Sequence, residues 1–134
     1  RPLAKVVSGG ELSRIMLAVK SVLADADAIE TLIFDEIDTG ISGRTAQKVS
    51  EKMAVIARKH QVICITHLPQ IAAMADDHYV IEKSAMEQRT ITEIYHLSDD
   101  ASVGEIARLL GGVKITDAVM QNAREMKNLA QSKK

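Results

Sequence analysis

The sequence predicts an α/β fold in which helices flank a mainly parallel sheet that carries an antiparallel hairpin at its edge. Two short apolar runs without alternation, at residues 32–34 and 62–66, are typical of strands buried on both faces of a parallel sheet. A segment with helical periodicity separates these two runs. Strand, helix and strand in this order predict a right-handed parallel crossover.

The first predicted helix covers residues 8–25, because apolar side chains recur in it at helical spacing: Leu12, Ile15, Met16, Val19, Val22 and Leu23. A strand is expected at residues 31–35. An amphipathic helix follows at residues 42–59, with an inward face made of Ala46, Val49, Met53, Ile56 and Ala57. The second strand, at residues 62–66, leads into a short helix at 69–75, where Pro69 suits the first turn.

The last third of the chain predicts a hairpin and two helices. Residues 78–82 and 90–97 are interpreted as a strand pair around the polar loop 83–89, although their alternation is imperfect. Ser102 and Glu105 match a capping box and predict a helix that ends at two glycines. Thr116 is expected to cap the final helix, whose inward residues are Val119, Met120, Ala123, Met126 and Ala130.

Composition fits one domain and excludes several classes of protein. The chain has 134 residues, 46% of them apolar and only 2% aromatic, so its core must be aliphatic. A formal net charge of −1 gives no general electrostatic case for binding nucleic acid. The single Cys64 lies in a predicted strand and excludes a disulfide framework within the chain. No apolar stretch is long enough to span a bilayer and no signal peptide is visible, which is compatible with the cytoplasm.

Two adjacent carboxylates, Asp35 and Glu36, follow the first predicted strand. Open α/β sheets bind their ligands at the carboxyl ends of strands. A carboxylate there can hold Mg²⁺, and its neighbour can orient or deprotonate an attacking water. The alternative is a strand that runs into a solvated acidic turn.

The segment Ser8-Gly9-Gly10-Glu11 opens the first helix. Ser8 and Glu11 fit a capping box, which explains these two residues without any ligand. Capping does not explain two glycines in the first turn, where each costs up to about 1 kcal/mol relative to alanine. Glycines at a helix N-terminus allow a phosphate to approach the backbone amides closely. Both interpretations remain open.

His67 ends the second predicted strand, so it should lie at the same edge of the sheet as the two carboxylates. A lone histidine is more often a structural hydrogen-bonding group than a catalytic one. The position at a parallel strand end nevertheless favours contact with a terminal phosphate. The other three histidines, His60, His78 and His96, lack the spacing of a zinc site.

Four motifs together resemble the heads of the SMC-like ABC-type ATPases, a group of P-loop NTPases. Their signature motif, Walker B, D-loop and switch histidine are similar, in this order, to Ser8-Gly9-Gly10-Glu11, residues 32–36, Asp38-Thr39-Gly40 and Thr66-His67. Longer stretches, at residues 7–18, 34–44, 65–72 and 109–112, resemble most closely the bacterial DNA-repair members of the group.

The resemblance implies roles for these residues, with ATP and Mg²⁺ as cofactors. Asp35 would help to hold Mg²⁺, Glu36 would polarise the hydrolytic water, and His67 would contact the γ-phosphate. The signature residues would bind ATP held by a second copy of the head: Ser8, Gly9, Gly10 and Glu11. Asp38 would lie across that dimer interface, although Asp38-Thr39-Gly40 is also a good turn sequence.

One motif of the group is missing. No G-x-x-x-x-G-K-S/T phosphate loop occurs among the seven glycines. Residues 1–134 are therefore expected to be the carboxyl-terminal lobe of a head, without the Walker A lobe and the coiled coil of the complete protein. The isolated chain is expected to be inactive.

The resemblance further implies three partners for the complete, nucleoid-associated protein: its own amino-terminal lobe, a second head and DNA. No DNA-contacting residue can be identified in this chain. Two alternatives remain open. One is the lobe of a transporter ATPase, which usually has glutamine in place of Glu11. The other is a non-catalytic nucleotide-sensing or dimerisation module.

Overall fold

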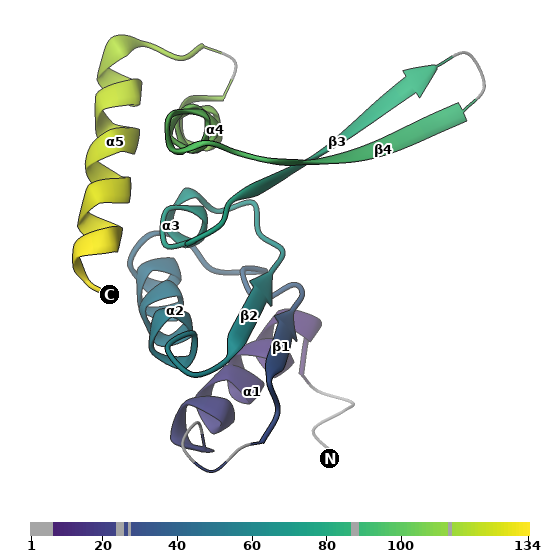
Figure 1. Ribbon diagram of the computed structural model, residues 1–134, viewed down its shortest axis with the longest axis vertical. Helices are drawn as coiled ribbons and strands as arrows, with labels where there is room; N and C mark the ends of the chain where they lie inside the picture. The colour runs from purple at the N-terminus through teal and green to yellow at the C-terminus, as the bar shows by residue number, and fades with distance from the viewer. Residues whose placement is uncertain (1–6, 24–25, 27, 87–88, 113) are drawn as a thin grey trace.

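The computed structural model describes residues 7–23, 26, 28–86, 89–112 and 114–134 (Figure 1). In chain order its first part contains α1 (Gly9–Leu23), β1 (Thr31–Phe34), α2 (Gly43–Ile56), β2 (Gln61–Cys64) and α3 (Pro69–Ala72). The second part contains β3 (Tyr79–Met86), β4 (Arg89–His96), α4 (Asp99–Gly111) and α5 (Asp117–Ser132). Each predicted element is present. The predicted end of the first helix at residues 24–25 and part of the hairpin loop lie outside the described residues.

The two strands predicted to be parallel are parallel. β1 pairs with β2 from Thr31 opposite Gln61 to Phe34 opposite Cys64, and the amide of Ile65 donates to the carbonyl of Phe34 at 3.1 Å. Side chains from β1, from the turn after it and from the three helices α1, α2 and α3 form a buried cluster: Leu17, Phe34, Ile37, Val49, Met53, Ile56 and Ile71. This cluster fixes the strand ends against the helices.

The prediction that these strands are buried on both faces is wrong. Phe34 is buried, but Ile33 is 68% exposed, and Ile63 and Ile65 are about half exposed. The helices of the described chain cover only the face that carries Phe34. The apolar runs predicted burial on both faces, and in the described residues only the face that carries Phe34 is buried.

The predicted antiparallel edge of the parallel sheet is also wrong. Within the described residues, β3 and β4 form a separate two-stranded sheet, with Tyr79 opposite His96 and Met86 opposite Arg89. The chain leaves the edge of β2 through α3, which packs beside α2, and the hairpin then projects away from the body of the molecule (Figure 1). Its strands are longer than predicted and include most of the expected loop.

A second core holds α3, α4 and α5 together. It contains Ala72, Ala73, Met74, Val103, Ile106, Ala107, Ala123 and Ala130. Thr116 caps α5 as predicted, since its hydroxyl accepts from the amide of Val119. The predicted start of α4 is wrong: Ser98 is the N-cap, and its hydroxyl accepts from the amide of Ala101. Ser102 lies inside the helix, buried, with its hydroxyl 2.8 Å from Nδ1 of His78.

The apolar stripe of α1 faces outward. Leu17 is the buried apolar side chain of this helix, whereas the six residues of the predicted stripe are between 43% and 83% exposed. In the part of the chain that the structure describes, no helix has the length and apolar character needed to cross a bilayer.

Candidate functional site

The carboxyl ends of β1 and β2 and the N-terminus of α1 bring the predicted site residues into one region. Asp35 and Glu36 follow β1 directly and are both exposed. Oδ1 of Asp35 accepts from the amide of Glu36 at 2.8 Å. Glu36 has φ of 57°, a left-handed conformation that costs a non-glycine residue about 1–2 kcal/mol. Strain of this kind gathers at functional sites, and here it falls on the predicted catalytic base.

Helix α1 holds the turn that follows these carboxylates. Its Arg14 guanidinium donates to the carbonyls of Ile37 and Thr39 at 3.0 and 2.8 Å. The hydroxyl of Ser13 donates to the carbonyl of Asp35 at 2.8 Å. Sequence reasoning gave Arg14 no role. In the sequence, Arg14 is noticeable only as a charged residue within a largely apolar helix. That pattern does not show which carbonyls the guanidinium binds.

The predicted capping box at the start of α1 is confirmed. The Ser8 amide donates to the Glu11 carboxylate at 2.9 Å, and the Glu11 amide donates to the Ser8 hydroxyl at 3.3 Å. The hydrogen bond from the Ser8 amide, followed by that from its hydroxyl, lowers the pKa of the Glu11 carboxyl. Capping therefore accounts for both residues in this chain, and their contact with a phosphate stays a prediction.

Gly10 is explained by close packing. A Cβ atom at this position would lie 2.8 Å from the carbonyl oxygen of Glu36 and 2.9 Å from both Cβ and the carbonyl oxygen of Thr39. Gly9 differs, because an added Cβ would meet only the end of the Glu36 side chain, with Oε2 at 2.1 Å. The Glu36 carboxylate thus lies against Gly9, at the N-terminus of α1. Packing does not require a glycine at position 9.

The structure joins Asp38 to His67. Asp38 is buried, and one oxygen, Oδ2, accepts from the Thr66 hydroxyl at 2.6 Å and from the His67 amide at 2.8 Å. The same oxygen lies 2.9 Å from Nδ1 of His67. Burial alone would raise the pKa of Asp38, but the hydrogen bonds from Thr66 and His67 outweigh it and lower the pKa. The dimer-interface role of Asp38 stays a prediction, and its carboxylate is occupied within its own chain.

Cys64 lies in β2, as predicted, and packs partly buried against the first buried cluster. Burial, with the negative charges of Asp38 and Asp35, raises the pKa of its thiol to about 12. The thiol therefore stays protonated near neutral pH and is a poor nucleophile or metal ligand.

Asp35 fits one part of a magnesium site. In the described residues, no group of three or more His, Cys, Asp or Glu side chains could hold a metal ion. Mg²⁺ in nucleotide-binding sites usually takes one or two carboxylates together with phosphate oxygens and water. An exposed carboxylate at a strand end meets that requirement when the other ligands come from a nucleotide and from another lobe.

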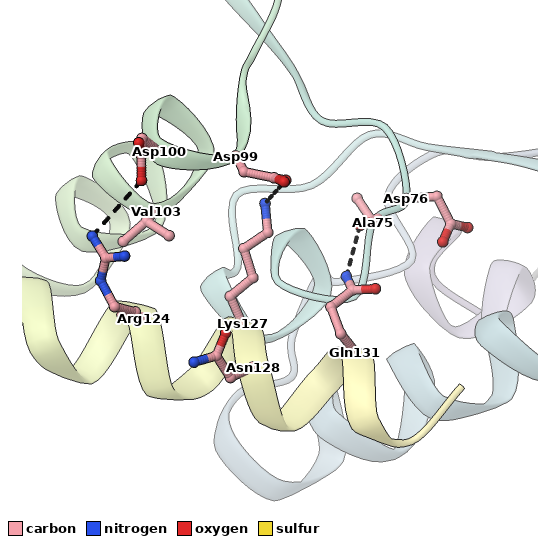
Figure 2. Close-up of a pocket in the computed structure, with 9 residues that line it drawn as sticks. All are labelled: Ala75, Asp76, Asp99, Asp100, Val103, Arg124, Lys127, Asn128 and Gln131. Carbon is pink, nitrogen blue, oxygen red and sulfur yellow. Dashed lines mark hydrogen bonds and ion pairs between the residues drawn. The ribbon is translucent and has the colours of Figure 1, made fainter.

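A hollow of about 330 Å³ lies between α4 and α5, and none of the predicted site residues lines it (Figure 2). Arg124 and Lys127 of α5 approach Asp100 and Asp99 of α4 at 3.8 and 3.2 Å. The amide of Gln131 donates to the carbonyl of Ala75 at 3.1 Å. The charged side chains that line the hollow pair with each other, and these ion pairs join α4 to α5.

Comparison with known proteins finds similar sequences among the DNA repair proteins named RecN. The chain is 49% identical to the DNA repair protein RecN of Halalkalibacterium halodurans over 132 residues, which cover 98% of this chain and 23% of that protein. It is 48% identical to RecN of Bacillus subtilis, over 94% of the chain and 22% of the relative. It is 44% identical to RecN of Mycobacterium leprae, over 99% of the chain and 22% of that relative. This chain is similar to a part of RecN. No protein-family model matches it.

The RecN-like chain spans less than a quarter of the length of these relatives. The similarity extends over almost all of it, so the strand-end carboxylates, the capped glycine turn and His67 all lie within a RecN-like sequence. These relatives favour the DNA-repair branch over the transporter ATPases.

Proposed function

We propose that this chain is the carboxyl-terminal lobe of the ATPase head of a RecN-like protein. The complete protein would couple ATP binding and hydrolysis to head dimerisation in the recombinational repair of DNA double-strand breaks. The observation that carries the proposal is the arrangement at the strand ends. Asp35 and a strained Glu36 follow β1, His67 follows β2, and the glycine turn of α1 packs against Glu36 and the turn that follows it.

The exposed side chains at this edge suit three different tasks in ATP hydrolysis. Asp35 would take a position in the coordination shell of Mg²⁺, as a carboxylate ligand. Glu36 would accept a proton from the attacking water, as a general base. The His67 ring, with its side chain 72% exposed, would contact the γ-phosphate. In a closed dimer, the α1 turn of one head would meet ATP bound to the other through Ser8, Gly9, Gly10 and Glu11.

The remaining contacts to ATP would come from an amino-terminal lobe of the same protein. That lobe would supply the phosphate loop, which the 134 residues lack. Two open apolar surfaces support such a partner: the outer stripe of α1, and the face of the β-pair that carries Ile33, Ile63 and Ile65. Exposed apolar patches of this kind mark interaction surfaces. DNA would be bound through the complete protein, at the nucleoid.

Paired amide substitutions in the complete protein test the proposal. Glu36→Gln keeps the size of the side chain but cannot accept a proton, so hydrolysis should fall about 10²- to 10⁴-fold while ATP binding and head association persist. Asp35→Asn should instead weaken Mg²⁺-dependent ATP binding along with hydrolysis. Glu30→Gln, the same change before β1 at the opposite end of the strand, is the control and should change neither property.

Turnover, ATP affinity and light scattering of the dimer separate these outcomes. Hydrolysis by Glu36→Gln at close to the parent rate would show that Glu36 is not the base. The isolated 134-residue chain should bind ATP weakly and release no phosphate. Micromolar binding with turnover by this chain would contradict the proposal that another lobe completes the site.

A further inference from the structure

Asp38 is the most completely bound side chain at the strand ends. It is 4% exposed, and its Oδ2 accepts from the Thr66 hydroxyl and the His67 amide, while Nδ1 of His67 lies 2.9 Å from the same oxygen. Burial raises the pKa of Asp38, but the hydrogen bonds from Thr66 and His67 outweigh it and lower the pKa, so the carboxylate is ionised near neutral pH.

This arrangement fixes the His67 ring. An ionised carboxylate can only accept, so Nδ1 at 2.9 Å from Oδ2 must carry a hydrogen. In the neutral ring, Nε2 then has the free lone pair. The ring remains largely exposed although one of its nitrogens is held by a buried group. A histidine held in this way is selected in both tautomer and orientation.

We propose that Asp38 is the positioning residue for His67: it holds Nδ1–H inward, so that Nε2 points to the phosphate of the nucleotide and donates to it once the ring has taken up a second proton. The proposal rests on the function proposed above, in which His67 contacts the γ-phosphate. It gives Asp38 a task within its own chain, and the contact across the dimer stays a prediction.

The same carboxylate connects His67 to helix α1. Asp38 lies between the two residues whose carbonyls Arg14 binds, Ile37 and Thr39. Arg14 thus binds the turn that carries Asp38 to helix α1, which begins at Gly9. The Asp38 side chain accepts from the His67 amide just after β2. The His67 ring, which would contact the ATP bound to its own head, and helix α1, which would contact the ATP bound to the other head, are therefore attached to the same short turn.

The tautomer of His67 tests the proposal directly. The chain is labelled with ¹⁵N-histidine, and the ring nitrogens of its four histidines are assigned with a His67→Gln variant. At a pH where the ring is neutral, His67 of the parent chain should carry its hydrogen on Nδ1. Asp38→Ala should release the ring and abolish this preference. Thr66→Val, which removes another donor to the same oxygen, is the matched control and should retain it.

Amide spectra of each variant establish that it folds. A neutral parent ring with its hydrogen on Nε2 would overturn the proposal, and so would an unchanged tautomer in a folded Asp38→Ala chain. Asp38→Asn keeps the shape of the side chain and removes its charge. It serves as the second variant if the alanine variant does not fold, and it should weaken the preference for a protonated Nδ1.

Kinetics in the complete protein give an independent readout. Groups that orient a functional histidine typically contribute about 10- to 100-fold to activity. Asp38→Ala should lower kcat by that factor with little change in KM for ATP, and it should add almost nothing to the loss caused by His67→Ala. Additive losses would overturn the positioning role. Unchanged hydrolysis in His67→Ala would instead overturn the proposed function of His67, whatever tautomer the ring adopts.

Discussion

Alanine substitutions at the two glycines of α1 should have different effects, although these residues are neighbours in one helical turn. Gly10→Ala places a Cβ atom 2.8–2.9 Å from three atoms of the turn that follows β1, two of which are backbone oxygens. Arg14 and the Thr39-to-Glu36 hydrogen bond hold this turn, so it cannot yield without losing those bonds. Overpacking of this kind typically costs about 1–3 kcal/mol.

Gly9→Ala meets a flexible group instead. The atom in its way is Oε2 of Glu36, the end of an exposed side chain that can rotate into solvent. Replacing glycine by alanine in a helix contributes up to about 1 kcal/mol of stability. This gain is common to both positions and cancels in the comparison. The difference in unfolding free energy between the two variants therefore measures the packing cost at Gly10, about 1–3 kcal/mol.

Urea unfolding of the chain, followed by circular dichroism, measures this difference. The slope of the free energy with urea should be the same for both variants, so that the midpoint alone reports stability. Gly9→Ala should be as stable as the parent or more stable, and Gly10→Ala should be the less stable variant. Equal midpoints would refute the close packing of α1 against the turn. A large loss in Gly9→Ala would show that position 9 also has a packing requirement.

Three further outcomes follow from single residues. Ser98→Ala should cost about 1 kcal/mol, because it removes the N-cap of α4; the urea midpoint checks this. Burial lowers the pKa of His78, so the unfolded chain binds its proton at higher pH than the folded chain does. Stability should therefore fall as pH drops below the unfolded value of about 6.5, and His78→Gln should remove this part of the pH dependence of the urea midpoint. A thiol pKa of about 12 should slow alkylation of Cys64 at pH 8 by about a thousandfold relative to the urea-unfolded chain, as mass spectrometry would show.

The order of helices and strands followed from the sequence because it depends on local patterns. Periodicity identified α2 and α5, and Thr116 marked the start of α5 correctly. The start of α4 was missed because Ser102 and Glu105 form the better capping-box match, while Ser98 lacks an acidic partner three residues later. Only the tertiary fold shows that Ser102 is buried against His78.

The candidate site was predictable in its location and less so in its connections. Parallel strands end at one edge of a sheet, so Asp35, Glu36 and His67 could be assigned to that edge from the sequence. Which carboxylate contacts His67 depends on the path of the turn after β1. That path is set by Arg14, by the left-handed Glu36 and by the close approach of Gly10. None of these contacts has a sequence signature.

Two apolar surfaces of the chain are exposed: one belongs to the strands that were wrongly predicted to be buried on both faces, and the other is the stripe of α1. The outer stripe of α1 and the Ile33 face of the β-pair are apolar in pattern and exposed in this chain. Isolated exposed apolar residues are ordinary, but a helical stripe of six together with an open strand face exceeds that background. In the function that we propose, an amino-terminal lobe covers both surfaces, and this chain spans 23% of the length of RecN of Halalkalibacterium halodurans. The disagreement between pattern and burial therefore falls on the two surfaces that we propose for the amino-terminal lobe.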